Sequence, residues 1–290
     1  MASTEKPEGL PKVVVPPDVR RRWRWMLKQY GGEKTALDLA HAIGRHGEGL
    51  VAQAKVPLGA PLETVRAILL LRMISGVDAI CMLTAFGFIT EAKTVHRSLV
   101  DALIRLRGLC KQPDLLYEYL AQESTDNTRL LEDFKQFQGK WGEPKESPTD
   151  AEVEAELNKA VAHRRTLEVE AGRELKKMNE WKWAIAGEIQ EIFWAHYALR
   201  SQSVHHSPRD LNRHLVENEK GEVYGILYGP ERERPTQLIL DATKALTLGM
   251  DAFADAAGVA ISEELADLDR SLADIYAAVA GSSDRSETDA

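Results

Sequence analysis

Apolar residues recur every three or four positions along most of the chain, which is the period of one helix face. Glycine and proline residues interrupt this pattern at intervals and mark the ends of its segments. The predicted helices cover about residues 18–30, 33–55, 62–86, 89–111, 114–137, 150–179, 183–204, 236–257 and 262–280. Such a succession of helical segments predicts an all-α fold, an irregular multi-helix bundle.

Three segments fall outside the helical pattern. Residues 1–17 carry four prolines and are expected to form a disordered tail, and residues 281–290 are expected to form a disordered acidic tail. Residues 207–235 lack a helical period, and the run EVYGILYGP within them predicts one short hairpin or loop. We therefore expect a single helical domain over 18–280, with its core at about 62–257.

The segment 89–111 carries apolar residues on more than one side, so other helices are expected to cover it on more than one side. The stripe and the residues that widen it are Leu99, Leu103, Leu106 and Cys110, then Val100, Ile104 and Leu109. Arg97 and Asp101 are four residues apart and lie roughly opposite this stripe. They form either a surface ion pair or part of an inward network that answers polar groups on a neighbouring helix.

The segment 150–179 is highly charged, and Thr149 or Asp150 can cap its start. Its polar face predicts a helix that projects from the bundle or pairs with another chain. Its acidic start and its basic stretch are self-complementary when two copies run antiparallel, which predicts a homodimer. The basic residues are His163, Arg164, Arg165, Arg173, Lys176 and Lys177.

The charge of the chain is uneven. With a net charge of −8, the molecule as a whole does not attract nucleic acid. The run RRRWRWMLK, however, places Arg20, Arg21 and Arg24 beside two tryptophans, a pattern that can grip RNA or an anionic membrane surface. The alternative is an amphipathic helix whose apolar residues pack on the bundle while the arginines face water.

Several classes of site are not expected. Cys81 and Cys110 lie in apolar helical runs, which indicates structural thiols and a reducing, cytoplasmic compartment. The most hydrophobic stretch is interrupted by Arg72 and Asp78, so no membrane span is expected. We also expect no metal and no cofactor, because adjacent histidines 205 and 206 have no third ligand at a recognisable spacing.

The run WAHYALRSQSVHHSP over 194–208 concentrates polar and basic residues at the end of an apolar helix. Arg200 falls on the flank of the expected apolar face, where a guanidinium needs an acidic partner or a bound anion. The residues of that face are Ile185, Ile189, Ile192, His196 and Leu199. Arg200 with His205 suits phosphate chemistry, since Arg binds the phosphate and His transfers a proton. Alternatively, Arg200 pairs with Asp101, and His205 caps the helix C-terminus.

Two stretches carry a resemblance to a known family. GFITEAKTVHRSLVDALIRLRGLCKQPDLLYEYL and the later HYALRSQSVHHSPRDL resemble a bacterial family of uncharacterised helical proteins over roughly residues 65–255. The first family pattern, an arginine followed within a few residues by an acid, is matched by Arg97 and Asp101. The second, tyrosine, serine and valine-histidine, is matched by Tyr197, by Ser201 or Ser203, and by Val204-His205.

That family in turn resembles the HEPN superfamily (higher eukaryotes and prokaryotes nucleotide-binding), whose motif is arginine, four to six residues, then histidine. Arg200 and His205 match this spacing, with Ser201 where active members usually have Asn, Asp or His. The resemblance implies a HEPN-like helical bundle, often dimeric, that acts as a metal-independent endoribonuclease in a bacterial stress or phage-defence system, together with a partner protein from the same operon.

In that role Arg200 would hold the phosphate and His205 would transfer the proton, while the RNA supplies its own 2′-hydroxyl as nucleophile. Tyr197, Ser201 and Ser203 would orient them, and Arg97 with Asp101 would support the site. The alternative function is a non-catalytic helical interaction module, in which the same residues form a buried structural network.

Overall fold

A computed structural model describes residues 31–57, 59–137, 148–194, 215–217, 223–226 and 236–283. Its helices are α2 (Gly31–Ala54), α3 (Pro61–Ala85), α4 (Ile89–Lys111), η1 (Pro113–Leu115), α5 (Leu116–Phe137), α6 (Asp150–Ala171), α7 (Glu180–Ala186), α8 (Gln190–Ile192), α11 (Thr236–Ala257) and α12 (Glu263–Ser283). The all-α, multi-helix bundle predicted from the sequence is confirmed. The predicted helix at 18–30, the N-terminal tail and residues 284–290 of the C-terminal tail lie outside the described residues. Residues 281–283, predicted to begin that tail, belong to α12 instead.

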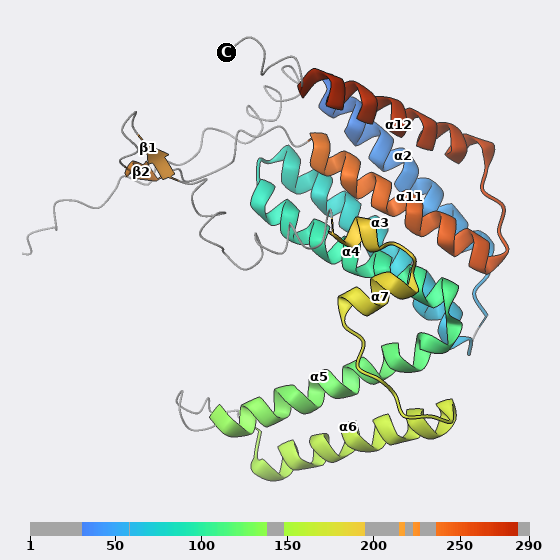
Figure 1. The fold of residues 1–290 in the computed structure, drawn as a ribbon, viewed down its shortest axis with the longest axis vertical. Coiled ribbons are helices and arrows are strands. Elements are labelled where there is room, and N and C mark those ends of the chain that lie inside the picture. The colour runs from blue at the N-terminus through green and yellow to red at the C-terminus, as the bar shows by residue number, and fades with distance from the viewer. Residues whose placement is uncertain are drawn as a thin grey trace, which may run out of the picture.

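Helix α4 occupies the centre of the bundle. It packs against α3, α11 and α7, and α2 and α12 complete the layer around α11 (Figure 1). All the apolar residues predicted to widen its surface, Val100, Ile104 and Leu109, are buried. The expectation that this helix is covered on more than one side is confirmed, and it follows from apolar residues distributed around most of the helix.

Helices α5 and α6 form a hairpin, here called the arm, that extends away from the bundle (Figure 1). A small core of its own holds it together, made of Ala121, Leu167 and Leu175. Thr149 caps α6 as predicted: its hydroxyl accepts a hydrogen bond from the Glu152 backbone N–H at 3.3 Å, and its own N–H donates to the Glu152 carboxylate at 2.7 Å.

The predicted end of the charged helix at 179 is wrong. Helix α6 ends at Ala171 because Gly172 adopts a left-handed conformation with φ of 66°. The N–H groups of Gly172 and Arg173 donate to the carbonyls of Val169 and Glu168, which closes the helix. Arg173 and the lysines that follow it are therefore not on the helix, and α6 already has α5 as its partner within the chain.

The single helix predicted over 183–204 is also wrong in its described part. Helix α7 ends at Ala186, and Glu188 has a positive φ of 55° before α8 begins. Ile185 is 46% exposed whereas Ile189 is only 6% exposed, so these residues do not share one apolar face. The apolar stripe on which Arg200 was expected to lie is therefore interrupted before it reaches residue 190.

Two short strands stand in the segment predicted to hold a hairpin or loop. Strand β1 (Leu215–Glu217) pairs antiparallel with β2 (Val223–Ile226), with Leu215 opposite Ile226. Strand β2 falls within the predicted run EVYGILYGP, where aromatic and branched residues favour an extended backbone.

By length and composition alone, one helix among the described residues, α3, could cross a membrane. The core helices of helical bundles pass the same test, and α3 buries Leu70, Met73 and Val77 in this bundle. Its opposite face carries exposed apolar side chains, including Ile68 and Met82.

Candidate functional site

The predicted site residues fall into two groups. Arg97 and Asp101 lie on α4, one turn apart, and both are partly buried. The others lie outside the described residues: Tyr197, Arg200, Ser201, Ser203, His205, and in the N-terminal basic run Arg20, Arg21 and Arg24. The convergence of Arg97, Asp101, Arg200 and His205 therefore stays a prediction.

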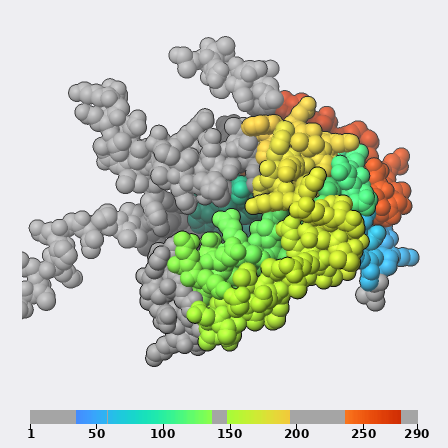
Figure 2. Space-filling view, turned by 60° about the horizontal axis from the view of Figure 1, so that its bottom comes forward, coloured from blue at the N-terminus to red at the C-terminus, as the bar shows by residue number. Residues whose placement is uncertain are grey.

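Asp101 lines a cleft of about 540 Å³ in the angle between the bundle and the arm. Figure 2 views the molecule from the side of the arm, with α5 and α6 in front of the bundle. The polar lining residues are Arg72 from α3, Ser98, Asp101 and Arg105 from α4, and Tyr119, Gln122 and Glu123 from α5. The side chain of Trp183 on α7 closes one wall and meets the Tyr119 ring edge-on, with ring centres 6.3 Å apart.

The ion pair that the structure forms at Asp101 is with Arg105, one turn later on the same helix. An acid that precedes a base by four residues is the favourable order on a helix, because it agrees with the helix dipole. Burial opposes the charge on Arg105, but the neighbouring Asp101 outweighs it and raises the pKa of the guanidinium. The sequence left open whether Arg97 and Asp101 form a surface ion pair or part of an inward network. Asp101 pairs with Arg105 and borders the cleft, so it is neither on the open surface nor fully enclosed.

Three cations and one anion follow each other at intervals of four residues on α4. Lys93, Arg97, Asp101 and Arg105 form this row, which we call the α4 row, and its last two members line the cleft. Arg72 faces the same cleft from α3, and Glu123 does so from α5. The arrangement offers guanidinium and hydroxyl donors beside a tryptophan wall, a combination that can bind a phosphate and a flat ring together.

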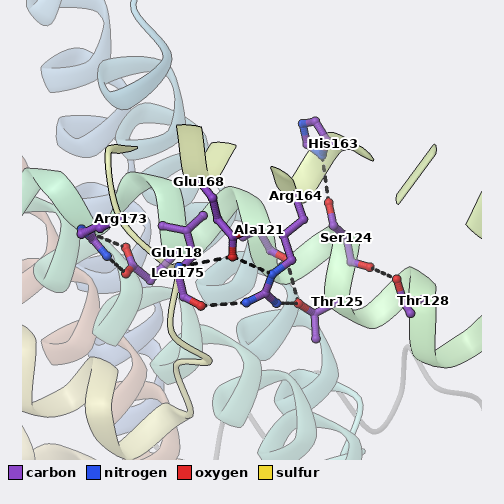
Figure 3. Close-up of polar contacts among 10 residues, drawn as sticks. All are labelled: Glu118, Ala121, Ser124, Thr125, Thr128, His163, Arg164, Glu168, Arg173 and Leu175. Atoms are coloured by element: carbon purple, nitrogen blue, oxygen red, sulfur yellow. Dashed lines mark hydrogen bonds and ion pairs between the residues drawn. The ribbon is translucent and has the colours of Figure 1, made fainter. Parts of the chain in front are cut away.

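A second polar cluster joins the two helices of the arm (Figure 3). Arg164 donates three hydrogen bonds: to the Thr125 hydroxyl at 3.0 Å, to the Leu175 carbonyl at 2.7 Å and to the Glu168 carboxylate at 3.2 Å. The chain that follows α6 is thereby fixed against α5. Two residues of the basic stretch expected to bind a second chain, Arg164 and Arg173, are engaged within their own chain, and association through this segment stays a prediction.

Glu118 and Arg173 form the second contact of this connection. Two guanidinium nitrogens of Arg173 meet the two carboxylate oxygens of Glu118, the second at 2.8 Å (Figure 3). The second nitrogen also donates to the Asp114 carbonyl at 3.2 Å. Burial pushes the pKa of the Glu118 carboxyl up, but the hydrogen bonds and charge of Arg173 outweigh burial and hold it below its ordinary value.

Ser124 and His163 also meet across the arm, with 2.9 Å between the hydroxyl and Nδ1 (Figure 3). A serine beside a histidine is the geometry of a nucleophile and its base. Ser124, however, is buried in the middle of α5, and no third group orients His163 among the described residues. We interpret the contact as a hydrogen bond that fixes the two helices, which the sequence did not predict because 39 residues separate the partners.

Burial affects both cysteines, whereas the two histidines of α2 lie at or near the surface. Burial raises the pKa of Cys81 to about 12 and that of Cys110 to about 11, so both thiols are protonated at neutral pH. His41 is exposed on α2, and His46 lies 3.6 Å from the Glu264 carboxylate. In the part of the chain that the structure describes, no three His, Cys, Asp or Glu side chains gather as a metal site.

Comparison with known proteins places the chain in a family. A model described as "Family of unknown function (DUF5677)" matches residues 63–222, which is more than half of the chain. No curated protein and no solved structure matches it. The matched segment contains every residue that lines the cleft, and also Arg200 and His205. The chain belongs to the family of unknown function DUF5677.

Proposed function

We propose that this protein is a metal-independent endoribonuclease that binds RNA along the α4 row and cleaves it beside the cleft. The observation that carries the proposal is that Asp101 and Arg105 line the cleft, at the end of a row with two further cations. Cationic side chains that run in a line along one helix suit a phosphate backbone, which supplies most of the affinity of a nucleic acid for a protein.

The connectivity of the chain supports a catalytic motif near this cleft. The ring of Trp194 meets that of Trp181 edge-on, with ring centres 5.9 Å apart. Trp181 lies on α7, the short helix that also brings Trp183 to the cleft wall. Arg200 follows Trp194 by six residues, and a chain of that length reaches at most about 20 Å. The likeness to HEPN proteins supplies the roles: Arg200 holds the phosphate, and His205 transfers the proton.

The chemistry needs no external nucleophile. His205 takes the proton of the RNA 2′-hydroxyl, whose oxygen attacks the adjacent phosphorus and expels the 5′-oxygen of the next nucleotide. That 5′-oxygen takes up a proton from water and leaves as a hydroxyl, and the protonated His205 then loses its proton to solvent. Arg200 stabilises the charge that develops on the phosphoryl oxygens, since its planar guanidinium can donate two parallel hydrogen bonds. The products would end in a 2′,3′-cyclic phosphate and a 5′-hydroxyl.

The test is to incubate the full-length protein with total bacterial RNA. Wild type is expected to cleave it, in the presence of a strong chelator as well, and His205→Ala is expected to lower the rate ~10²–10⁴-fold, the usual worth of a positioned general base. Arg200→Lys should also fail, because a point charge does not reproduce the two-pronged donor. His206→Ala is the matched control, with full activity expected.

A further variant tests whether the cleft is the binding site. Arg105→Ala is expected to raise KM about fivefold, the worth of roughly 1 kcal/mol, with little change in kcat. Arg129→Ala, an exposed arginine on the arm, should leave KM unchanged. An unchanged KM in Arg105→Ala would place RNA binding elsewhere.

The second candidate function is a non-catalytic interaction module. One observation favours it: Trp181, Phe193 and Trp194 form an aromatic cluster with two exposed tryptophans, and exposed aromatic clusters are typical of protein contacts. If wild type fails to cleave RNA, alone and together with the products of neighbouring genes, this function is the better one. Cleavage that survives in His205→Ala would remove the proposed mechanism.

A further inference from the structure

One face of α3 is turned to solvent and carries three exposed large apolar side chains, two in the first half of the helix and one near its C-terminal end. Ile68 is 50% exposed, Leu71 41% and Met82 63%. Together with the exposed Arg72, Ser75 and Asp78 they lie within about 60° of one line along the helix. We call these six residues the outer stripe. Exposed large apolar side chains grouped on one helix face usually mark a surface that another molecule covers.

Five of the six residues of the outer stripe are placed symmetrically about Ser75, whereas Leu71 has Ala79 at the matching position. Ile68 precedes Ser75 by seven residues and Met82 follows it by seven, so the two large apolar side chains stand at equal distances of about 10 Å from it. Arg72 precedes it by three residues and Asp78 follows it by three, about 4.5 Å away along the axis. The two charges at equal distance from the centre are opposite in sign.

We propose that two copies of this chain associate through α3, with the two helices antiparallel and a twofold axis at Ser75. In that arrangement Ile68 of one copy meets Met82 of the other at the same height, and Arg72 meets Asp78, each contact occurring twice. Ser75, a small residue at the centre, allows the two backbones to approach closely.

The charges favour a second copy over an unrelated partner. In the part of the chain that the structure describes, neither Arg72 nor Asp78 forms an ion pair within its own chain. Pairing with an identical helix satisfies both groups at once, whereas a purely apolar partner would leave them desolvated and unpaired. In the charged segment, by contrast, Arg164 on α6 and Arg173 just after it are engaged within the chain.

The dimer would border the cleft. Arg72 belongs to the outer stripe and also lines the cleft, as does Gly76 one residue after the centre. The partner's helix would therefore stand beside the cleft entrance. Since this interface is argued from α3 alone, it does not depend on RNA cleavage.

A charge-exchange series tests the interface. Wild type is expected to be a dimer by light scattering at micromolar concentration and to dissociate on dilution. Arg72→Asp and Asp78→Arg alone each bring like charges together, which is expected to raise the dimer Kd about tenfold or more. The double variant restores opposite charges and should return Kd close to the wild-type value. Lys159→Glu, an exposed reversal on α6, is the control and should leave Kd unchanged.

A cross-link tests the position of the twofold axis. In a background with Cys81→Ala and Cys110→Ala, Ser75→Cys should give a disulfide-linked dimer under mild oxidation, because the two residues face each other. Ser271→Cys, on the exposed side of α12, should remain mostly uncoupled.

Three results would overturn the proposal. The first is a wild type that is monomeric across the micromolar range. The second is a dimer whose Kd responds to neither single charge reversal, or is not restored by the double variant. The third is equal cross-linking at positions 75 and 271. Circular dichroism that matches wild type for every variant separates loss of association from loss of folding.

Discussion

At the scale of single residues, the contact between Glu118 and Arg173 is the strongest polar link in the connection after α6. Glu118→Gln removes the charge and keeps one acceptor oxygen. We expect it to lower the free energy of unfolding by about 1–2 kcal/mol at neutral pH, toward the low end because Arg173 is partly exposed and solvent screens the pair. Chemical denaturation of both proteins measures the difference.

The same contact predicts a pH dependence. The pKa of Glu118 is lowered in the folded protein, so its contribution is present above the unfolded pKa and is lost as pH falls through the folded pKa. The gap between wild type and Glu118→Gln should therefore close as the solution is acidified. Glu156→Gln, at an exposed pair with Lys159, serves as the control and should cost less than about 0.5 kcal/mol at any pH. A gap that does not change with pH would contradict this assignment.

Contacts between individual residues could be predicted from the sequence only where the partners are close along the chain. Sequence reasoning placed Arg97 and Asp101 on one helix, and it found the cap at Thr149, because these relations span three or four residues. It did not find Arg105 as the ion-pair partner of Asp101, although the spacing of four residues carried that signal. The link between Ser124 and His163 had no signal at all, since it depends on how two helices align.

At the scale of elements, the close approach of α7 to α4 depends on Gly187 after α7 and on Gly108 within α4. A Cβ on Gly187 would lie 3.0 Å from Arg107 Cβ and 3.2 Å from the Gly108 backbone nitrogen. Gly187→Ala is therefore expected to destabilise the fold by about 1–3 kcal/mol through overpacking. Thermal unfolding checks this value.

Gly49→Ala is the matched control for that substitution. Gly49 lies within α2 with no atom within 4 Å of its missing Cβ, so alanine should stabilise the fold by about 0.5–1 kcal/mol through its better helix propensity. If both substitutions change stability in the same direction, close packing at Gly187 is not the cause.

The helix ends show what a pattern can and cannot predict. The bounds of α4 and α11 agree with prediction because proline, glycine and polar residues end the apolar period there. The break at Gly187 was missed because apolar residues continue with helical spacing through it. The tertiary contact with α4 overrides that spacing, and only the packed structure contains this information.

At the scale of the whole molecule, the bundle and the arm should differ in stability. The bundle buries one large continuous core, whereas the separate apolar cluster of the arm contains three buried residues. Hydrogen exchange is therefore expected to be slowest in α4 and α11 and clearly faster in α5 and α6, because local opening of the arm exposes little apolar surface. Mass spectrometry of exchanged peptides measures this, and equal protection of arm and bundle would show that they unfold as one unit.

The fold class followed from the sequence, but the shape did not. Short connections and helical periods predict an all-α bundle. They do not predict that α5 leaves the bundle, since a charged helix is equally compatible with lying on the surface. The cleft was missed for the same reason, because it exists only in the angle between α5 and α4.

The angle between α5 and α4 links the position of the arm to the shape of the cleft. Helix α5 has 22 residues, which corresponds to a length of about 33 Å, and the short turn η1 at Pro113 joins it to α4. A rotation of α5 by about 10° at η1 would carry the C-terminal end of the helix through about 6 Å for such a length. The same rotation would also move Tyr119 and Glu123, which lie in the first turns of α5 and form one wall of the cleft. A large displacement at the far end of the arm would therefore accompany a small change in the width of the cleft.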